Sequence, residues 1–145
     1  MQATLDKFAA RATIELGVTT HCSLILRTPS SADQVASNDF RAAACDQLEA
    51  RDGRGPCITA IEQLSSVVVD DLETDRRWPE WNQAARSFGF RAFIALPGYV
   101  DEGTTVALNA YSEEPTSWQR PQIIRLDQYV QQLAATLHRP HGWQA

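Results

Sequence analysis

The chain has 145 residues, of which 43% are hydrophobic and 21% are charged, and its net charge is −5. This length fits one domain with a substantial core, and the composition excludes a disordered, collagen-like or coiled-coil chain. The arginines are scattered among acidic residues, whereas a nucleic-acid-binding protein concentrates its basic residues on one surface. We therefore expect no direct binding to DNA or RNA.

Three cysteines occur, at positions 22, 45 and 57, and they form no C-x-x-C pair. An odd number of cysteines, together with an N-terminus that lacks the apolar segment of a secretory signal, indicates a reduced, cytoplasmic setting. No apolar run approaches the ~18 residues that a membrane span requires. We expect a cytoplasmic protein that makes no contact with a membrane.

The first part of the chain predicts a helix followed by a hairpin. Apolar residues recur at helical spacing over 3–16, and alternating residues over 21–28 predict a strand. Proline and small polar residues at 29–33 predict a loose turn, and residues 34–38 follow as a second, short strand.

The middle of the chain alternates short helices with a buried strand. Asn38 or Asp39 can cap the first of these helices, and Pro56 and Pro79 can start the other two, because a first helical turn does not use the missing N–H. The β-branched run at 66–70 predicts a buried strand. The predicted helices cover residues 40–51, 56–64 and 79–88.

The last part of the chain predicts a second hairpin and a long helix. Strands at 91–100 and 104–112 are joined by an Asp-Glu-Gly turn, and a helix covers 118–138. Two hairpins with helices between them favour an antiparallel sheet covered by helices, which is an α+β fold.

Apolar residues of the last predicted helix recur in steps of three and four at Ile123, Leu126, Val130, Leu133 and Leu137. One interpretation is that this stripe only packs on the sheet. The other is that a 3.5-residue repeat also forms the seam of a dimer together with the first helix. Two heptads do not decide between these interpretations.

Five segments, in this order, resemble a GAF domain: "HCSLILR", "GRGPCITAI", "SVVVDDLETDRRWPEW", "GFRAFIALPGYVDEGTTVALNAYS" and "EPTSWQRPQIIRLDQYVQQLAATL". The most diagnostic pair is the G-x-G-P-C turn followed by D-D-L and D-x-R-W-P. The chain is most similar to the actinobacterial GAF domains that accompany an RNA-binding ANTAR output module. The resemblance predicts a single domain over 1–138, with 139–145 as a C-terminal tail.

The resemblance implies a central antiparallel sheet of five to six strands, with the terminal helices on one face. Short helices and loops on the other face enclose a small-molecule pocket, and the terminal helices often form a homodimer. It identifies no cofactor and no particular ligand. By matching positions, it implies that the ligand-binding residues are Ser23, Asn38, Pro56, Cys57, Asp71, Trp78, Trp81 and Ala85.

The glycine-rich turn at 53–57 does not have the pattern of a phosphate-binding loop, which needs G-x-x-x-x-G-K-[ST]. Its glycines and Pro56 instead favour a tight turn into a helix. Cys57 then lies at a helix start, where the macrodipole lowers the pKa of a thiol. It is either a small core residue or a pocket-lining thiol that is sensitive to redox state.

Other chemistry is poorly supported. GAF proteins that reduce free methionine sulfoxide carry their catalytic cysteine after the third strand, and residues 70–93 contain no cysteine. Pro140 separates His138 from His141 in the tail, so the histidines predict no metal site. We therefore expect no catalytic residues and no bound metal.

The segment "DDLETDRRWPEW" supplies the richest candidates for a binding site. Trp78 and Trp81 lie three residues apart, hence on one helical face if both are in the helix, where they either roof the core or stack on a flat ligand. Asp71 can accept a ligand donor. Asp75 and Arg77 form a solvated charge cluster, or Arg77 meets an anionic ligand.

The sequence thus predicts a non-enzymatic small-molecule sensor, acting in signalling or transcription regulation, whose loops at 29–33 and 70–80 tighten over a ligand. Two alternatives remain open: a structural dimerisation module whose cavity is filled by its own aromatic residues, and a thiol redox sensor or reductase that uses Cys57. The chain is either a stand-alone module or a piece of a longer protein that has an output domain or partner.

Overall fold

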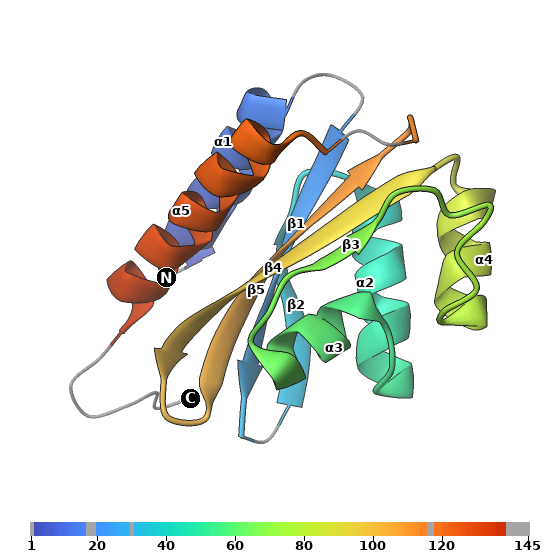
Figure 1. Cartoon of the computed structure of the whole chain (residues 1–145). Coiled ribbons are helices and arrows are strands. Elements are labelled where there is room, and N and C mark those ends of the chain that lie inside the picture. The colour runs from blue at the N-terminus through green and yellow to red at the C-terminus, as the bar shows by residue number, and fades with distance from the viewer. Residues whose placement is uncertain (1, 17–19, 30, 116–117, 139–145) are drawn as a thin grey trace.

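The computed structural model describes residues 2–16, 20–29, 31–115 and 118–138. At its centre these residues form an antiparallel sheet of five strands in the order β2-β1-β5-β4-β3, as Figure 1 shows. The strands are β1 (Thr20–Thr28), β2 (Ser31–Ser37), β3 (Val67–Val69), β4 (Ala92–Asp101) and β5 (Thr104–Ser112). The two hairpins β1–β2 and β4–β5 meet side by side through β1 and β5. The predicted α+β fold is confirmed.

In the described part of the chain, five helices cover the two faces of this sheet (Figure 1). The terminal helices α1 (Gln2–Leu16) and α5 (Arg120–Leu137) lie side by side on one face. The other face carries α2 (Phe40–Asp52), α3 (Pro56–Gln63) and α4 (Pro79–Ser87). The layers are those that the sequence predicts, and most predicted boundaries lie within two residues of these bounds.

The stripe of α5 packs on the protein's own sheet. Leu126, Val130, Leu133 and Leu137 are all buried in an aliphatic cluster with α1 and the sheet. Gly98 of β4 permits this close approach, because a Cβ there would lie 2.9 Å from the carbonyl oxygen of Val130. These α5 residues therefore belong to the core of one chain.

The first hairpin is tighter than the sequence predicts. The expected loose turn at 29–33 is wrong, because β2 begins at Ser31 rather than at residue 34. The backbone of Ser31 lies opposite Thr28, and that of Ala32 opposite Arg27. Serine and aspartate favour a turn locally, but pairing with a long neighbouring strand satisfies the backbone groups and extends the strand.

The loop between β3 and α4 is held by side chains. Asn82 donates its amide N–H to the carbonyl oxygens of Leu72 (3.0 Å) and Asp75 (3.2 Å). Arg77 pairs with Asp75 at 2.7 Å and donates to the carbonyl oxygen of Val68 in the edge strand β3 at 3.1 Å. The charge cluster at 75–77 therefore makes structural contacts within this loop.

Candidate functional site

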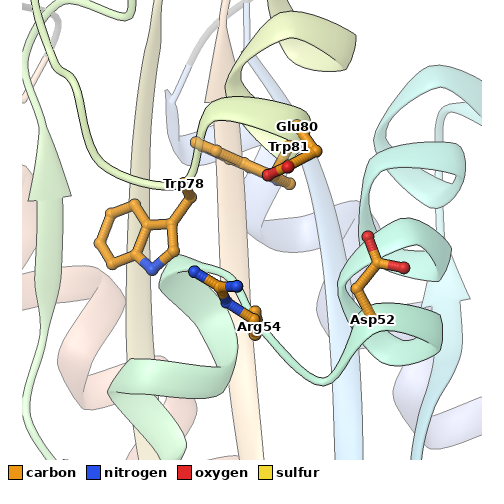
Figure 2. Close-up of a pocket in the computed structure, with 5 residues that line it drawn as sticks. All are labelled: Asp52, Arg54, Trp78, Glu80 and Trp81. Atoms are coloured by element: carbon orange, nitrogen blue, oxygen red, sulfur yellow. The ribbon is translucent and has the colours of Figure 1, made fainter.

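A surface cavity of about 310 Å³ lies between the turn that follows α2 and the start of α4. We call it the rim pocket, and its lining residues are Asp52, Arg54, Trp78, Glu80 and Trp81. Figure 2 shows Trp78 on one side, the Asp52 carboxylate on the opposite side, and Arg54 between them. Its volume is at the lower end of the range for small-molecule sites.

Trp78 is placed in the rim pocket by an unusual backbone. It is the N-cap of α4, with φ 49° and ψ 66°, a left-handed conformation that costs free energy in a residue other than glycine. The two indoles therefore do not share a helical face. Instead Trp78 meets Trp81 edge-on, at a centroid distance of 6.3 Å and an interplanar angle of 88°.

Trp81 forms the inner wall of the rim pocket and fills the space beneath α4. Its side chain is 2% exposed, and its ring centroid lies 4.9 Å from that of Phe93. Its indole Nε1 donates to the hydroxyl oxygen of Tyr111 at 3.3 Å. The aromatic side chains of Phe90, Phe93 and Tyr111 continue this packing beneath the helices.

Beyond Tyr111 lies a buried carboxyl group, Asp46 of α2. It accepts hydrogen bonds from the Tyr111 hydroxyl (2.8 Å), the Asn109 amide (3.2 Å) and the Ser23 hydroxyl. Burial raises the pKa of Asp46 to about 6, although these three hydrogen bonds act in the opposite direction. Donors from β1 and β5 thus converge on one carboxylate in the centre of the molecule.

A second buried carboxyl group, Glu49, lies one turn further along α2. Its Oε1 accepts the backbone N–H of Cys57 at 2.9 Å, and a Cβ on Gly55 would clash with its side chain. Burial raises the pKa of Glu49 well above its usual value, and the neighbouring Asp46 adds to this effect. Glu49 Oε2 and Asn109 Oδ1 are buried without a hydrogen-bond partner among the described residues.

Both walls of the rim pocket are therefore connected to α2 by hydrogen bonds. On one side, Trp81 bonds to Tyr111, which bonds to Asp46. On the other side, the backbone of the turn that follows Arg54 is fixed by the bond from the Cys57 N–H to Glu49. A displacement of residues in either wall therefore alters the hydrogen bonds of a carboxyl group that has no contact with solvent.

The predicted site residues occupy several environments. Trp78 and Trp81 line the rim pocket, and Ser23 bonds to Asp46. Asn38 is exposed and accepts the backbone N–H of Cys22 at 3.0 Å, and Asp71 pairs with Arg91 at 3.3 Å. The remaining three are buried in the core beneath α2, α3 and α4: Pro56, Cys57 and Ala85.

The expectation that a helix start lowers the pKa of Cys57 is wrong. The side chain is fully buried, and burial, reinforced by Glu49, raises the pKa of its thiol well above the usual value. Burial also raises the pKa of Cys45. A neutral thiol is a poor nucleophile, so the helix dipole has less influence here than the loss of solvent.

Sequence reasoning missed Asp46, Glu49, Asn109 and Tyr111. A signal was present in α2, because Ala42, Cys45, Asp46 and Glu49 follow the i, i+3, i+4, i+7 spacing of a buried face. Two acidic residues on such a stripe indicate buried carboxyl groups.

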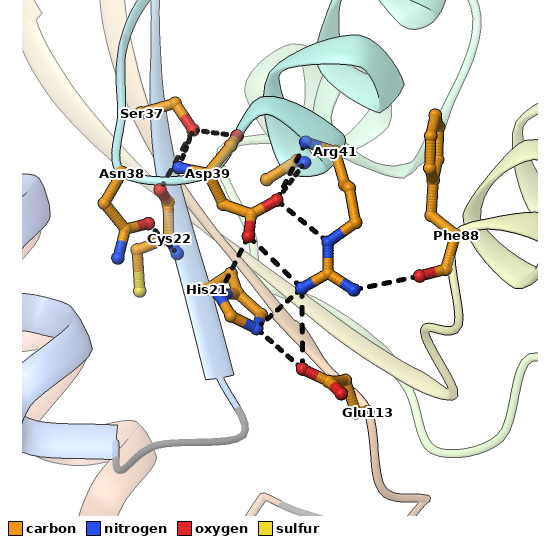
Figure 3. Close-up of polar contacts among 9 residues, drawn as sticks. His21, Cys22, Ser37, Asn38, Asp39, Arg41, Phe88 and Glu113 are labelled. Carbon is orange, nitrogen blue, oxygen red and sulfur yellow. Dashed lines mark hydrogen bonds and ion pairs between the residues drawn. The ribbon is translucent and has the colours of Figure 1, made fainter.

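A second polar cluster connects α2 and the end of α4 to the end of the sheet (Figure 3). His21 contacts Asp39 through Nδ1 (3.2 Å) and Glu113 through Nε2 (2.8 Å). Arg41 bonds to Asp39 at 3.2 Å and donates to the carbonyl oxygen of Phe88 at 3.0 Å. Asp39 also accepts the backbone N–H of Arg41 and is the cap of α2. This cluster joins β1, α2, the end of α4 and the segment that follows β5.

The described part of the chain contains no group of three histidine, cysteine or acidic side chains arranged to hold a metal ion. Within the same residues, no helix has both the length and the apolar character needed to cross a bilayer.

The sequence of this chain matches a known protein family. The family model of the GAF domain matches residues 1–137. The chain belongs to the GAF domain family. A comparison with curated proteins found no match.

Solved structures of other proteins have the same fold. A domain of a putative two-component sensor histidine kinase from Sinorhizobium meliloti superposes with a TM-score of 0.75 at 14% identity, covering 94% of this chain and 90% of that one. A GAF domain from Synechocystis sp., in its photoproduct state, gives a TM-score of 0.68 at 19% identity, with 94% and 92% covered. An N-acylhomoserine lactone-dependent LuxR-family transcription factor from Burkholderia cenocepacia gives 0.62 at 21% identity, with 90% and 79% covered. At these identities the likeness establishes the GAF fold, which signalling sensors share.

Proposed function

We propose that this GAF domain is a non-enzymatic sensor that binds a small molecule in the rim pocket and acts in signalling or transcription regulation. The supporting observation is the hydrogen-bonded path from Trp81 through Tyr111 to Asp46, which also holds Ser23 of β1. A ligand that displaces Trp81 changes the hydrogen bonds of the central strands, whose opposite face carries α1 and α5. Because side chains hold residues 71–77, we assign the response to Trp81 rather than to closure of this loop.

Native mass spectrometry of protein purified from its own host tests this proposal. We expect the wild-type protein to retain a small molecule and the Trp78→Gly variant to lose it. Glycine accepts the left-handed backbone at this position, so this variant removes the pocket wall without backbone strain. The control is Tyr99→Ser, which alters a side chain that is 57% exposed and lies outside the rim pocket. A wild-type protein with the mass of the bare polypeptide contradicts the proposal.

We further propose that the partner is a second copy of the domain, bound through α1 and α5. Ile14 on α1 is 79% exposed and Ile124 on α5 is 49% exposed. The two helices run antiparallel (Figure 1), so these residues lie at the same end of the helix pair. Substitutions of Leu126 or Val130 cannot test this dimer interface, because both side chains are buried within one chain.

The oligomeric mass of an Ile14→Asp/Ile124→Asp variant tests the dimer. We expect a monomer from the double variant and a dimer from the wild-type protein. Phe40→Asp, which changes a residue that is 78% exposed on α2, is the matched control and leaves the dimer intact. A wild-type monomer at micromolar concentration removes the proposed interface.

A redox sensor that uses Cys57 is the weaker alternative. All three cysteines are free and buried, and burial raises the pKa of the Cys57 thiol, which makes it a poor nucleophile. We expect iodoacetamide to label Cys57 only after unfolding. Rapid labelling of the native protein near neutral pH would favour the redox function instead.

A further inference from the structure

The charges in the rim pocket differ from those elsewhere on this face of the molecule. Asp75 pairs with Arg77 at 2.7 Å and Asp71 with Arg91 at 3.3 Å. Among the described residues, by contrast, the side chains of Arg54 and Glu80 have no ion-pair or hydrogen-bond partner, although both line one cavity. A positive and a negative group thus remain available in the same small space.

The turn that carries Arg54 is fixed rather than loose. Gly53 ends α2 with φ 67°, and its N–H donates to the carbonyl oxygen of Glu49 at 2.8 Å. On the other side of Arg54, Glu49 accepts the N–H of Cys57. The backbone on both sides of Arg54 is therefore bonded to one residue of α2, which fixes the point from which the Arg54 side chain extends into the pocket (Figure 2).

The remaining walls have the chemistry for a flat, cationic group. Asp52 bonds only to its exposed neighbour Arg51 among the described residues, at 3.1 Å, and its carboxylate lies on the side of the pocket away from Trp78. The indole of Trp78 is half-buried and already attracts a cation, because the Arg77 guanidinium lies 4.7 Å from its ring centroid. Aromatic and cationic groups are both favourable beside this ring.

We infer that the rim pocket binds a small planar compound that carries one positive and one negative charge. This inference rests on the proposed sensor function. The anionic group pairs with Arg54, the cationic nitrogen pairs with Glu80 and Asp52, and the ring lies against Trp78. A compound with only an anionic group is repelled by the carboxylates of Asp52 and Glu80. A compound with only a cationic group leaves Arg54 unpaired. Both should therefore bind less tightly than the doubly charged compound.

Three matched probes test the inference with the full chain: 4-(aminomethyl)benzoate, benzoate and benzylamine. Binding is followed by titration in ¹H–¹⁵N correlation spectra, with the indole N–H signals of Trp78 and Trp81 as reporters. We expect the doubly charged probe to bind at least about tenfold more tightly than either singly charged probe, a difference typical of one added charge-assisted hydrogen bond.

Two charge-neutralising variants locate each contact. Arg54→Gln should weaken binding of 4-(aminomethyl)benzoate and benzoate but not of benzylamine, and Glu80→Gln should weaken binding of 4-(aminomethyl)benzoate and benzylamine but not of benzoate. Glu62→Gln, an exposed change on α3, is the control for net charge. Equal affinities for the three probes, or indole signals that do not respond to any probe, overturn the inference.

The two proposals can fail separately. If protein from the host carries a ligand whose retention is unchanged by Arg54→Gln and Glu80→Gln, the sensor function stands and the charge assignment is wrong. If the host protein is bare and no probe binds, both are wrong.

Discussion

The face of the sheet beneath α1 and α5 is packed with aliphatic side chains, whereas the face beneath α2, α3 and α4 buries two carboxyl groups, an amide and a phenol. The first face contributes stability by removing apolar surface from water. On the second face, Asp46 and Glu49 lose their hydration, and Glu49 Oε2 gains no hydrogen-bond partner among the residues that the structure describes. Such an arrangement lowers stability, and proteins tolerate this cost most often at functional sites.

The largest effect should come from placing a carboxylate on the aliphatic face. Val130→Asp puts a charge at a site that is 1% exposed, without the donors that surround Asp46. We expect a loss of at least about 4 kcal/mol in the free energy of unfolding, measured by urea denaturation. Gln132→Asp, on the exposed side of α5, is the control and should cost less than about 1 kcal/mol. Similar losses of unfolding free energy in both variants would contradict the proposed difference between the two faces of the sheet.

Removing the carboxylate of the polar face should have the next largest effect. Asp46→Ala leaves the Ser23, Asn109 and Tyr111 donors without their acceptor, and we expect a loss of about 3 kcal/mol. Asp46→Asn keeps an acceptor and the shape of the side chain, so its loss should be about 1 kcal/mol. If urea denaturation gives equal losses for the two variants, the hydrogen bonds of Asp46 do not contribute as described.

The pH dependence of stability separates the faces further. The pKa of Asp46 is raised from 3.8 to about 6 in the folded protein, so the native state binds this proton more tightly than the unfolded chain does. The contribution of Asp46 to the free energy of unfolding should therefore fall by about 3 kcal/mol as pH rises from about 4 to about 6. The contribution is full below the unfolded pKa and is lost as pH rises through the folded pKa.

The difference between wild-type and Asp46→Asn unfolding curves measures this contribution together with the effect of Asp46 on the neighbouring Glu49. Hydrogen bonds from Arg77 lower the pKa of Asp75, which therefore stabilises the fold in the opposite sense, with stability lost as pH falls below the usual aspartate range. Asp75 is present in both proteins, so its effect cancels. A wild-type profile parallel to that of Asp46→Asn between pH 4 and 6 would show that Asp46 does not titrate in this range.

The smallest effect should come from the exposed end of the His21 cluster. The hydrogen bond from His21 lowers the pKa of Glu113, but this carboxylate is 42% exposed, so solvent screens the pair. Glu113→Gln should change the free energy of unfolding by about 0.5 kcal/mol, and the change should shrink in high salt. A salt-independent loss would assign Glu113 a packing role instead.

The sequence predicts the fold well because its signals are local. The glycines of "GRGPC", the prolines that start α3 and α4, and the stripe of α5 each determine an element within a few residues. The start of β2 was missed because Ser31–Asp33 have turn-forming side chains and become a strand only through pairing with β1. The start of α4 at Pro79 was predicted correctly, but the sequence does not indicate the left-handed backbone of Trp78 that precedes it.

The site was predicted less completely, because burial depends on the whole fold. The sequence identified Trp78 and Trp81, but it did not identify Arg54 or Glu80, whose shared cavity forms only when α4 packs above the turn after α2. Asp46 was missed because a polar residue in a helix is normally exposed. The sheet and α3 cover this side of α2, and no neighbouring residue in the sequence indicates that contact.

The short edge strand β3 has a consequence for the behaviour of the domain at high concentration. The carbonyl of its middle residue, Val68, is occupied by the guanidinium of Arg77, and the strand has only three residues. A short edge that carries a fixed positive charge is a poor template for a strand from another molecule. This edge therefore resists the strand-by-strand assembly that leads to amyloid-like aggregates.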